Sequence, residues 1–149
     1  MEDEKKSAES NVMGFVADGC LPEKFRRMSG MEKLNAVLGL PDAVSLIKSI
    51  DPQEFYFLVR EIGRSDSTEL IMYSSQEQLK AIFDMEVWNG DRFSPLRFAQ
   101  WFDVLLACGY ERSQEALSQI DGEILMNFIM SQAEVDLKED EEKTLESGD

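Results

Sequence analysis

Apolar residues recur three and four positions apart along most of the chain, which is the spacing of one face of an α-helix. The clearest helix start is Asp51-Pro52, because aspartate is a favoured N-cap residue and proline a favoured first helical residue. The apolar residues after this start share one face: Phe55, Leu58, Val59 and Ile62. Gly63 then ends the pattern, so a helix is predicted between Asp51 and Gly63.

The same start and stop signals predict a series of further short helices. In chain order they are Met31–Leu38, Asp42–Ser49 with Pro41 at its start, a helix capped by Asp66 or Ser67 that ends at Tyr73, a helix capped by Ser75, Pro95–Cys108, Glu111–Ile120 and a last helix capped by Asp121. Two pairs match the capping box, in which side chain and backbone bond reciprocally at a helix start: Ser29 with Glu32, and Ser75 with Gln78.

Two of these predicted helices carry extensive apolar faces. The helix from Pro95 to Cys108 would turn inward Phe98, Trp101, Phe102 and Leu105. The helix after Asp121 would present a broad apolar face formed by Ile124, Leu125, Phe128 and Ile129. We expect both faces to be buried.

Alternating runs of apolar and polar residues, typical of strands, are missing. The segment V-W-N-G-D-R-F resembles a β-hairpin around Asn89-Gly90, but its flanks are short and border on helical sequence. We therefore interpret it as a turn. Residues 31–135 are predicted to be helical apart from the connections, with no strand longer than a single bridge, and the fold class is all-α.

Helical segments of similar pattern recur at a distance of 70 residues. This shift places Ile50-Asp51 on Ile120-Asp121, and a weaker match at a shift of 24 places Asp51 on Ser75. A single helical hairpin cannot bury its own apolar stripe, so neighbouring hairpins must stack. The pattern therefore predicts a compact superhelix of stacked helical hairpins.

Negative charge is concentrated at both ends of the chain. The 149 residues carry a net charge of −15, to which residues 1–20 contribute −3 and residues 136–149 contribute −5. We expect a flexible segment at 1–20 without a signal peptide, a single all-α helical-repeat domain at 21–136 and a solvated acidic tail at 137–149. Residues 138–149 are predicted to fray, because their one large apolar residue, Leu145, offers little to bury.

The composition excludes several kinds of chemistry. The chain has no histidine, which removes Ser-His-Asp and Cys-His catalysis, histidine-ligated zinc and a histidine pH switch. Strong negative charge disfavours nucleic acids and anionic membranes, and no apolar stretch reaches the ~20 residues of a bilayer span. We expect Cys108 to be a buried, inert thiol and Cys20 to be exposed. Unpaired cysteines suit a reducing compartment, so we expect a cytoplasmic protein. The composition and the lack of a long apolar stretch predict neither a cofactor nor membrane insertion.

Three segments resemble a bacterial domain family of unknown function: Leu38–Gly63, Ser74–Phe93 and the Trp101-Phe102-Asp103 region. The resemblance covers about residues 35–135, and the W-N-G-D-R-F stretch is its most specific part. At the level of the fold, the repeated cap followed by an apolar helix is similar to the N-terminal superhelical domain of MgtE magnesium transporters. It is also similar to the middle domain of the flagellar motor switch protein FliG, by analogy only. The resemblance implies no catalytic residue.

Two groups of residues are candidate sites. Asp84, Glu86 and Asp91 are weak candidates for oxygen ligands of Mg²⁺ or Ca²⁺, although their spacing departs from that of an EF-hand and solvated caps or turns explain the same acids. Trp88, Asp91 and Arg92 are candidates for partner binding, since Trp88 ends a predicted helix beside a polar turn.

These patterns predict a non-enzymatic protein-interaction or regulatory module whose partner is another protein. The alternative is an acidic domain that senses a divalent cation such as Mg²⁺, by analogy with the magnesium transporter. An enzyme is the third possibility, because a chain without histidine or a phosphate-binding loop offers no recognisable mechanism.

Overall fold

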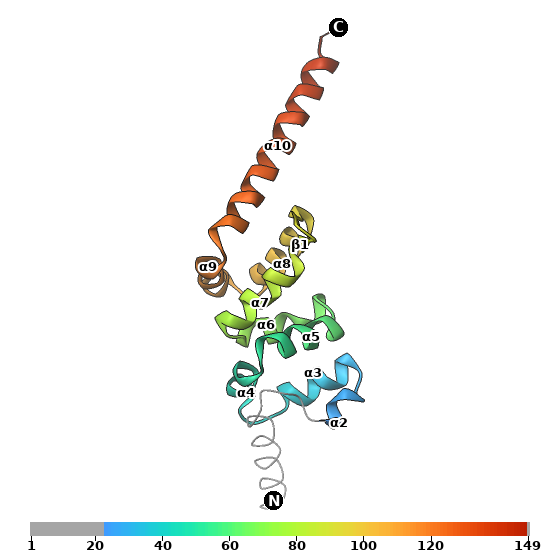
Figure 1. The fold of residues 1–149 in the computed structure, drawn as a ribbon, viewed down its shortest axis with the longest axis vertical. Coiled ribbons are helices and arrows are strands. Elements are labelled where there is room, and N and C mark those ends of the chain that lie inside the picture. The colour runs from blue at the N-terminus through green and yellow to red at the C-terminus, as the bar shows by residue number, and fades with distance from the viewer. Residues whose placement is uncertain (1–22, 149) are drawn as a thin grey trace, which may run out of the picture.

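The computed structural model describes residues 23–148, in which helices follow one another from one end of an elongated molecule to the other (Figure 1). In chain order the elements are α2 Glu23–Arg26, α3 Gly30–Leu38, α4 Ala43–Ser49, α5 Pro52–Ile62, the 3₁₀ helix η1 Ser65–Ser67, α6 Thr68–Tyr73, α7 Gln76–Glu86, β1 Trp88–Asn89, β2 Arg92–Phe93, α8 Pro95–Ala107, α9 Tyr110–Gln119 and α10 Gly122–Glu146. The predicted all-α fold class is confirmed. The segment expected to be flexible, 1–20, and with it Cys20, lies outside the described residues.

Side-chain caps begin the helices at most of the predicted positions. Asp51 Oδ1 accepts hydrogen bonds from the backbone amides of Gln53 (2.9 Å) and Glu54 (3.3 Å). Asp121 Oδ1 accepts in the same way from the amide of Glu123, at 2.9 Å. Both predicted capping boxes are also present, at Ser29 with Glu32 and at Ser75 with Gln78.

Two helix starts differ from the expectation. Helix α4 begins at Ala43, two residues after Pro41, and the Asp42 side chain makes no cap bond. Ser67 does not cap α6 either: its hydroxyl donates to the carbonyl of Gly63, at 2.7 Å. The 3₁₀ turn η1 precedes α6 and directs this hydroxyl back along the chain, so the serine ties the turn together.

Residues 88–93 form a β-hairpin, so the interpretation of this segment as a simple turn is wrong. Strands β1 and β2 pair antiparallel with Trp88 opposite Phe93, and the ladder is longer than a single bridge. Gly90 has φ 62°, and glycine at the first central position of a two-residue loop is typical of a type II′ hairpin turn. The rings of Trp88 and Phe93 pack edge to face, 5.7 Å apart, and both contact the core, which stabilises a ladder too short to persist alone.

The core runs the length of the stack and is formed by one face of each helix. Its largest fully buried side chains are Phe55, Phe83, Phe98, Leu46, Ile47, Leu58, Leu70, Ile71, Ile82 and Leu105. The ring of Phe98 lies 5.7 Å from that of Phe83 and 4.6 Å from that of Phe128, measured between centroids. Helix α8 therefore joins α7 to α10. Its predicted inward face is buried except for Phe102, which is half-buried and stacked on Phe98.

The part of the chain from α5 to α7 and the part from α8 to α10 share local geometry at an offset of 46 residues. Gly63 and Gly109 both have φ 100°, a conformation that favours glycine. The serine four residues after each, Ser67 or Ser113, donates its hydroxyl to that glycine's carbonyl, at 2.7 and 2.6 Å. By the same offset, α5 corresponds to α8 and α7 corresponds to α10. The superhelix itself stays a prediction.

Helix α10 projects beyond the rest of the molecule (Figure 1). It continues to Glu146, ten residues past the expected domain boundary at 136, and its residues from 132 onward are exposed. The expectation of a frayed tail overlooked helix propensity, since glutamate, lysine and leucine fill this stretch up to Gly148. Within residues 23–148, no helix combines the length and apolarity needed to cross a membrane.

The apolar face of α10 is narrower than predicted. Ile124 is buried and Leu125 and Phe128 are half-buried, but the side chain of Ile129 is 61% exposed. Helix α10 packs chiefly on α8, which covers only one side of it.

Candidate functional site

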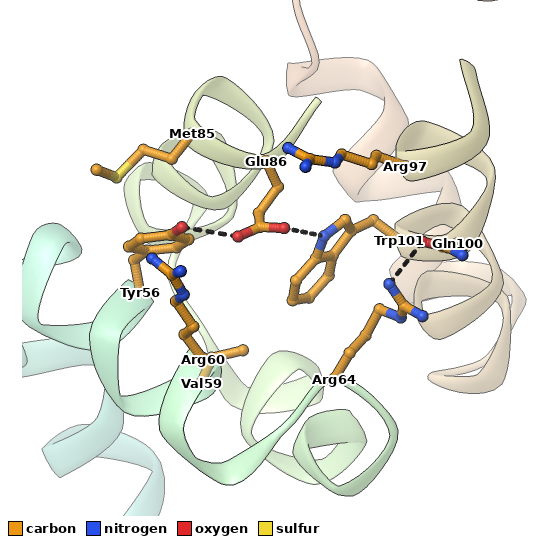
Figure 2. A pocket seen from close by; sticks show the side chains of 9 residues that line it. All are labelled: Tyr56, Val59, Arg60, Arg64, Met85, Glu86, Arg97, Gln100 and Trp101. Atoms are coloured by element: carbon orange, nitrogen blue, oxygen red, sulfur yellow. Dashed lines mark hydrogen bonds between the residues drawn. The ribbon is translucent and has the colours of Figure 1, made fainter. Parts of the chain in front are cut away.

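Helices α5, α7 and α8 surround a pocket of about 410 Å³ (Figure 2). Its lining is Tyr56, Val59, Arg60, Arg64, Met85, Glu86, Arg97, Gln100 and Trp101. We call it the arginine pocket, because three of the seven arginines of the chain line it.

Helical spacing places matching pairs of side chains on two walls of the arginine pocket. Arg60 follows Tyr56 by four residues on α5, and Trp101 follows Arg97 by four residues on α8. Residues four apart lie on one face of a helix, so each wall contributes one aromatic ring and one guanidinium group (Figure 2). The aromatic residues are buried and the arginines face the open side of the pocket, since Tyr56 and Trp101 are each 5% exposed while Arg60 and Arg97 are exposed.

The carboxylate of Glu86 joins the two walls. Its Oε1 accepts the hydroxyl of Tyr56 at 2.7 Å, and its Oε2 accepts the indole N–H of Trp101 at 3.3 Å (Figure 2). Glu86 is the last residue of α7, where the helix dipole disfavours negative charge, and these two donors stabilise the carboxylate there. Three helices are thereby connected through one side chain.

Tyr56 is held in its protonated form by this arrangement. Burial raises the pKa of its hydroxyl, and the hydrogen bond to Glu86 and the charge of that carboxylate raise this pKa further, against a smaller opposing effect of Arg60. At neutral pH the hydroxyl therefore remains a donor to Glu86. It offers neither a base nor a nucleophile.

The three arginines give the pocket a positive field. Within residues 23–148, none of Arg60, Arg64 and Arg97 takes part in an ion pair. Arg64 Nη1 donates to Gln100 Oε1 at 2.8 Å, which orients this guanidinium along the wall. Glu86 is the one acid of the lining, so positive charge exceeds negative charge in the pocket although the whole chain has a net charge of −15. Such a group of guanidinium donors can bind a carboxylate or a phosphate.

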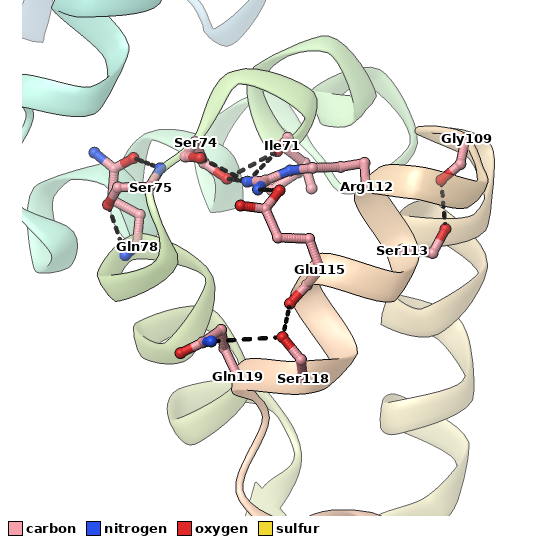
Figure 3. A network of polar contacts seen from close by, with 10 residues as sticks. All are labelled: Ile71, Ser74, Ser75, Gln78, Gly109, Arg112, Ser113, Glu115, Ser118 and Gln119. Carbon is pink, nitrogen blue, oxygen red and sulfur yellow. Dashed lines mark hydrogen bonds and ion pairs between the residues drawn. The ribbon is translucent and has the colours of Figure 1, made fainter.

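Arg112, in contrast, is engaged by other groups of the fold (Figure 3). Its Nη2 donates to the carbonyl of Ser74 at 2.6 Å and to that of Ile71 at 3.4 Å, while its Nη1 pairs with Glu115 at 2.9 Å. The pairing with Arg112 lowers the pKa of Glu115. Arg112 thus fastens α9 to the connection between α6 and α7, and its charge is balanced, unlike those in the arginine pocket.

The three weak metal candidates are engaged separately. Asp84 is exposed and pairs with Lys80, Nζ to Oδ2 2.9 Å; Glu86 lies in the arginine pocket; Asp91 is exposed at the hairpin turn. Among residues 23–148, no three acidic or cysteine side chains gather where they could hold a metal ion.

The three partner-binding candidates lie on the hairpin rather than in the arginine pocket. Trp88 is half-buried against Phe93, so much of its indole serves the core. Asp91 and Arg92 are both exposed, and in the described part of the chain they form no ion pair with each other. Exposure keeps these two side chains available to a partner.

Cys108 is half-buried at the end of α8. Its thiol lies 3.2 Å from the carbonyl of Val104 and 3.4 Å from that of Thr68. Burial raises its pKa, and Arg112 opposes this rise more weakly. The thiol is therefore protonated at neutral pH and a poor nucleophile.

Sequence reasoning missed most of the arginine pocket. It considered Glu86 as a metal ligand and Trp101 as core, and it left Arg60, Arg64 and Arg97 unassigned. The available signal was the pairing of an aromatic residue with an arginine four positions away on one predicted helix face, as in Tyr56 with Arg60 and Arg97 with Trp101.

Comparison with known proteins identifies a family. The model of a family of unknown function, DUF6178, matches residues 21–149. The searches of curated proteins and of solved structures each found no match, so the expected likeness to MgtE and FliG has no support from them. Because the family model covers most of its length, the chain belongs to the DUF6178 family of unknown function.

Proposed function

We propose that this protein is a non-enzymatic interaction module that binds an acidic segment of a partner protein in the arginine pocket. One observation carries the proposal: in residues 23–148, three arginines without an ion pair converge on one pocket of a strongly acidic chain. Acidic side chains are twice as numerous as basic ones in this chain, 30 against 15. Three neighbouring arginines that nevertheless have no acidic partner among the described residues favour the binding of an external anion.

The electrostatics of the pocket favour an anionic ligand. Guanidinium groups that share a pocket repel one another, and a bound carboxylate removes that repulsion while it accepts their hydrogen bonds. The hydrogen bonds of Glu86 to Tyr56 and Trp101 hold α5, α7 and α8 together, so both walls of the pocket are ordered before the ligand arrives. Met85, 43% exposed, adds an apolar surface for the aliphatic part of a bound peptide.

The chemistry of the lining supports binding rather than catalysis. Arginine stays protonated at neutral pH and cannot act as a general base. Glu86 is engaged by two donors, and the raised pKa of Tyr56 keeps its hydroxyl neutral. No lining residue is therefore placed to abstract a proton or to attack a substrate.

The alternative of a divalent-cation sensor has less support. Asp84 is neutralised by Lys80, and Glu86 lies among arginines that repel a cation. The analogy with the MgtE domain adds no residue of this chain to that role.

Fluorescence polarisation of a labelled peptide tests the proposed function. The probe is an unstructured peptide with several aspartates and glutamates, and its reference is the same peptide with asparagine and glutamine in their places. We expect the acidic peptide to bind, and the double variant Arg60→Gln/Arg97→Gln to bind it at least about tenfold more weakly, as expected when arginine anchors are removed. In a Trp88→Phe background, which leaves Trp101 as the one tryptophan, a change in tryptophan fluorescence on binding would report occupancy next to Trp101.

A matched control separates the pocket from overall charge. Arg26→Gln/Arg27→Gln removes the same two charges from exposed positions near α2, and it should change the affinity by less than about twofold. Equal weakening by both double variants would show that only net charge matters, and an acidic peptide that does not bind the unaltered protein would refute the proposed function.

A further inference from the structure

Helix α10 carries an exposed apolar stripe. Its members are 58 to 65% exposed and lie three, four and eleven positions after the first: Met126, Ile129, Met130 and Leu137. These spacings place them along one side of the helix. We call this set the α10 stripe. Leucine, isoleucine and methionine exposed singly are ordinary on protein surfaces, but four in one line form a surface that another helix can cover.

For Ile129, one member of the stripe, the internal correspondence of the fold shows how a following helix can cover it, whereas the other three members correspond to exposed polar residues. At the offset of 46 residues, Ile129 on α10 corresponds to Phe83 on α7. Phe83 is 2% exposed, because Phe98 of the next helix packs on it with ring centroids 5.7 Å apart. Within residues 23–148, no element packs on Ile129 in this way, and its side chain is 61% exposed. On α7, helix α8 covers the surface around Phe83, whereas the corresponding surface around Ile129 on α10 is exposed.

The charge of α10 indicates the character of a helix that would fit there. The helix holds eight acidic residues and two lysines between Gly122 and Glu146. Among the described residues, none of these acids forms an ion pair, because the three ion pairs lie elsewhere. A second copy of α10 would bring like charge against like charge, which disfavours self-association. A helix with lysines and arginines beside its apolar face would instead be attracted.

We propose that the α10 stripe binds an amphipathic helix of another protein whose apolar face is flanked by basic residues. Methionine side chains adapt to the shape of a partner, and two of the four members are methionines. The spacing of Met126, Met130 and Leu137 by four and seven residues matches the seam along which two helices pack. This inference does not depend on the arginine pocket, which lies on other helices and takes a ligand of opposite charge.

Isothermal titration calorimetry with designed peptides tests the inference. The first probe is a helical peptide of about 20 residues with leucines on one face and lysines on the other, measured at about 0.15 M salt so that weak surface attraction is screened. The second probe has the same leucines with glutamate in place of lysine. We expect the lysine peptide to bind at least about tenfold more tightly than the glutamate peptide.

Variants then locate the binding surface. Met126→Gln/Ile129→Gln/Met130→Gln removes the centre of the stripe without changing charge or helix propensity much, and it should weaken binding of the lysine peptide about tenfold or more. Its control replaces three exposed apolar residues at the other end of the stack, in Met31→Gln/Val44→Gln/Phe57→Gln, and should leave affinity within about twofold. Circular dichroism and thermal unfolding confirm that both variants remain folded.

Three results would overturn the inference. The lysine peptide could fail to bind, or it could bind the stripe variant as tightly as the unaltered protein, which would mean attraction by charge alone. Sedimentation analysis could also show a dimer of the unaltered protein that the stripe variant loses, in which case a second copy of the chain occupies the stripe.

Discussion

Gln78 connects two parts of the helical stack through a fully buried side chain. Its Nε2 donates to the carbonyls of Ile47 and Ile50, at 2.7 Å each, and its Oε1 accepts the backbone N–H of Ser75 at 2.8 Å. The side chain is 0% exposed. It therefore joins the end of α4 to the start of α7 across 28 residues of sequence, and replacing it should destabilise the fold strongly.

The substitution Gln78→Leu replaces the amide side chain with an apolar one of roughly similar size. It removes both N–H donors and the acceptor oxygen of the amide. The Ile47 carbonyl still accepts from the amide of Ile50, at 3.2 Å. The Ile50 carbonyl and the Ser75 amide lose their bonds to Gln78. The free energy of unfolding should fall by about 1–3 kcal/mol for the buried Ile50 carbonyl left unpaired, with a smaller further loss for the part-buried Ser75 amide.

The substitution Gln78→Glu tests the same contacts with a predicted pH dependence. A carboxylate keeps an acceptor for Ser75 but places a negative oxygen against the carbonyls of Ile47 and Ile50. The folded state therefore favours the protonated acid, and the pKa of the new group rises above its value of about 4.3 in the unfolded chain. The folded state then holds the proton more tightly, so the stability of this variant relative to the unaltered protein is greatest at low pH and falls as pH rises through the folded pKa.

Urea unfolding at about pH 5 and about pH 8, followed by circular dichroism, measures these effects. The unaltered protein at each pH is the reference, and Gln114→Glu, an exposed position on α9, controls for the added charge. A loss below about 0.5 kcal/mol for Gln78→Leu would refute the reasoning, because surface substitutions commonly stay within that range. So would a loss for Gln78→Glu that matches the control at both pH values.

Three further predictions concern other parts of the chain. Alanine at Asp51 or Asp121 should lower the free energy of unfolding by ~0.5–2 kcal/mol, whereas asparagine, which still accepts the cap bonds, should cost little; urea unfolding of the four variants decides, and equal loss for both replacements would contradict a capping role. Deletion of residues 138–149, of which 138–148 are exposed, should move the thermal midpoint by less than about 5 °C in calorimetry, and a larger drop would show that this part of the chain docks on the protein. Because burial and Glu86 raise the pKa of Tyr56, the stability that this group contributes is present below the ordinary tyrosine pKa and is lost as pH rises through the folded pKa. The free energy of unfolding, measured between about pH 9 and about pH 11, should therefore fall more steeply for the unaltered protein than for Tyr56→Phe, and parallel curves would contradict this.

The helix starts could be predicted because their causes are local. A cap bond joins residues two or three apart, as from Gln53 to Asp51 or from Glu123 to Asp121, so the relevant atoms are adjacent in the sequence itself. The same holds for the apolar spacing that identifies a buried helix face. The β-hairpin at 88–93 was missed for the opposite reason, since its two-residue strands depend on the packing of Trp88 and Phe93 on the core.

The burial of residues along α10 also depends on neighbouring helices, which the apolar spacing of α10 itself does not identify. Phe128 and Ile129 are equally apolar and adjacent, but α8 covers the first and leaves the second exposed. Periodicity shows which side chains can share a face, and tertiary packing decides how much of that face is covered.

The arginine pocket belongs wholly to the tertiary structure. The hydroxyl of Tyr56 meets Glu86 across 30 residues of sequence, and the indole of Trp101 meets the same carboxylate across 15. The sequence by itself determined that α5, α7 and α8 are helices and which way each turns its apolar face, because those properties arise within one or two turns of chain. Which polar side chains then converge between the helices depends on how the helices cross. Only the packing of α5, α7 and α8 on one core brings Tyr56 and Trp101 to Glu86. The same packing gathers three arginines that, among the described residues, form no ion pair.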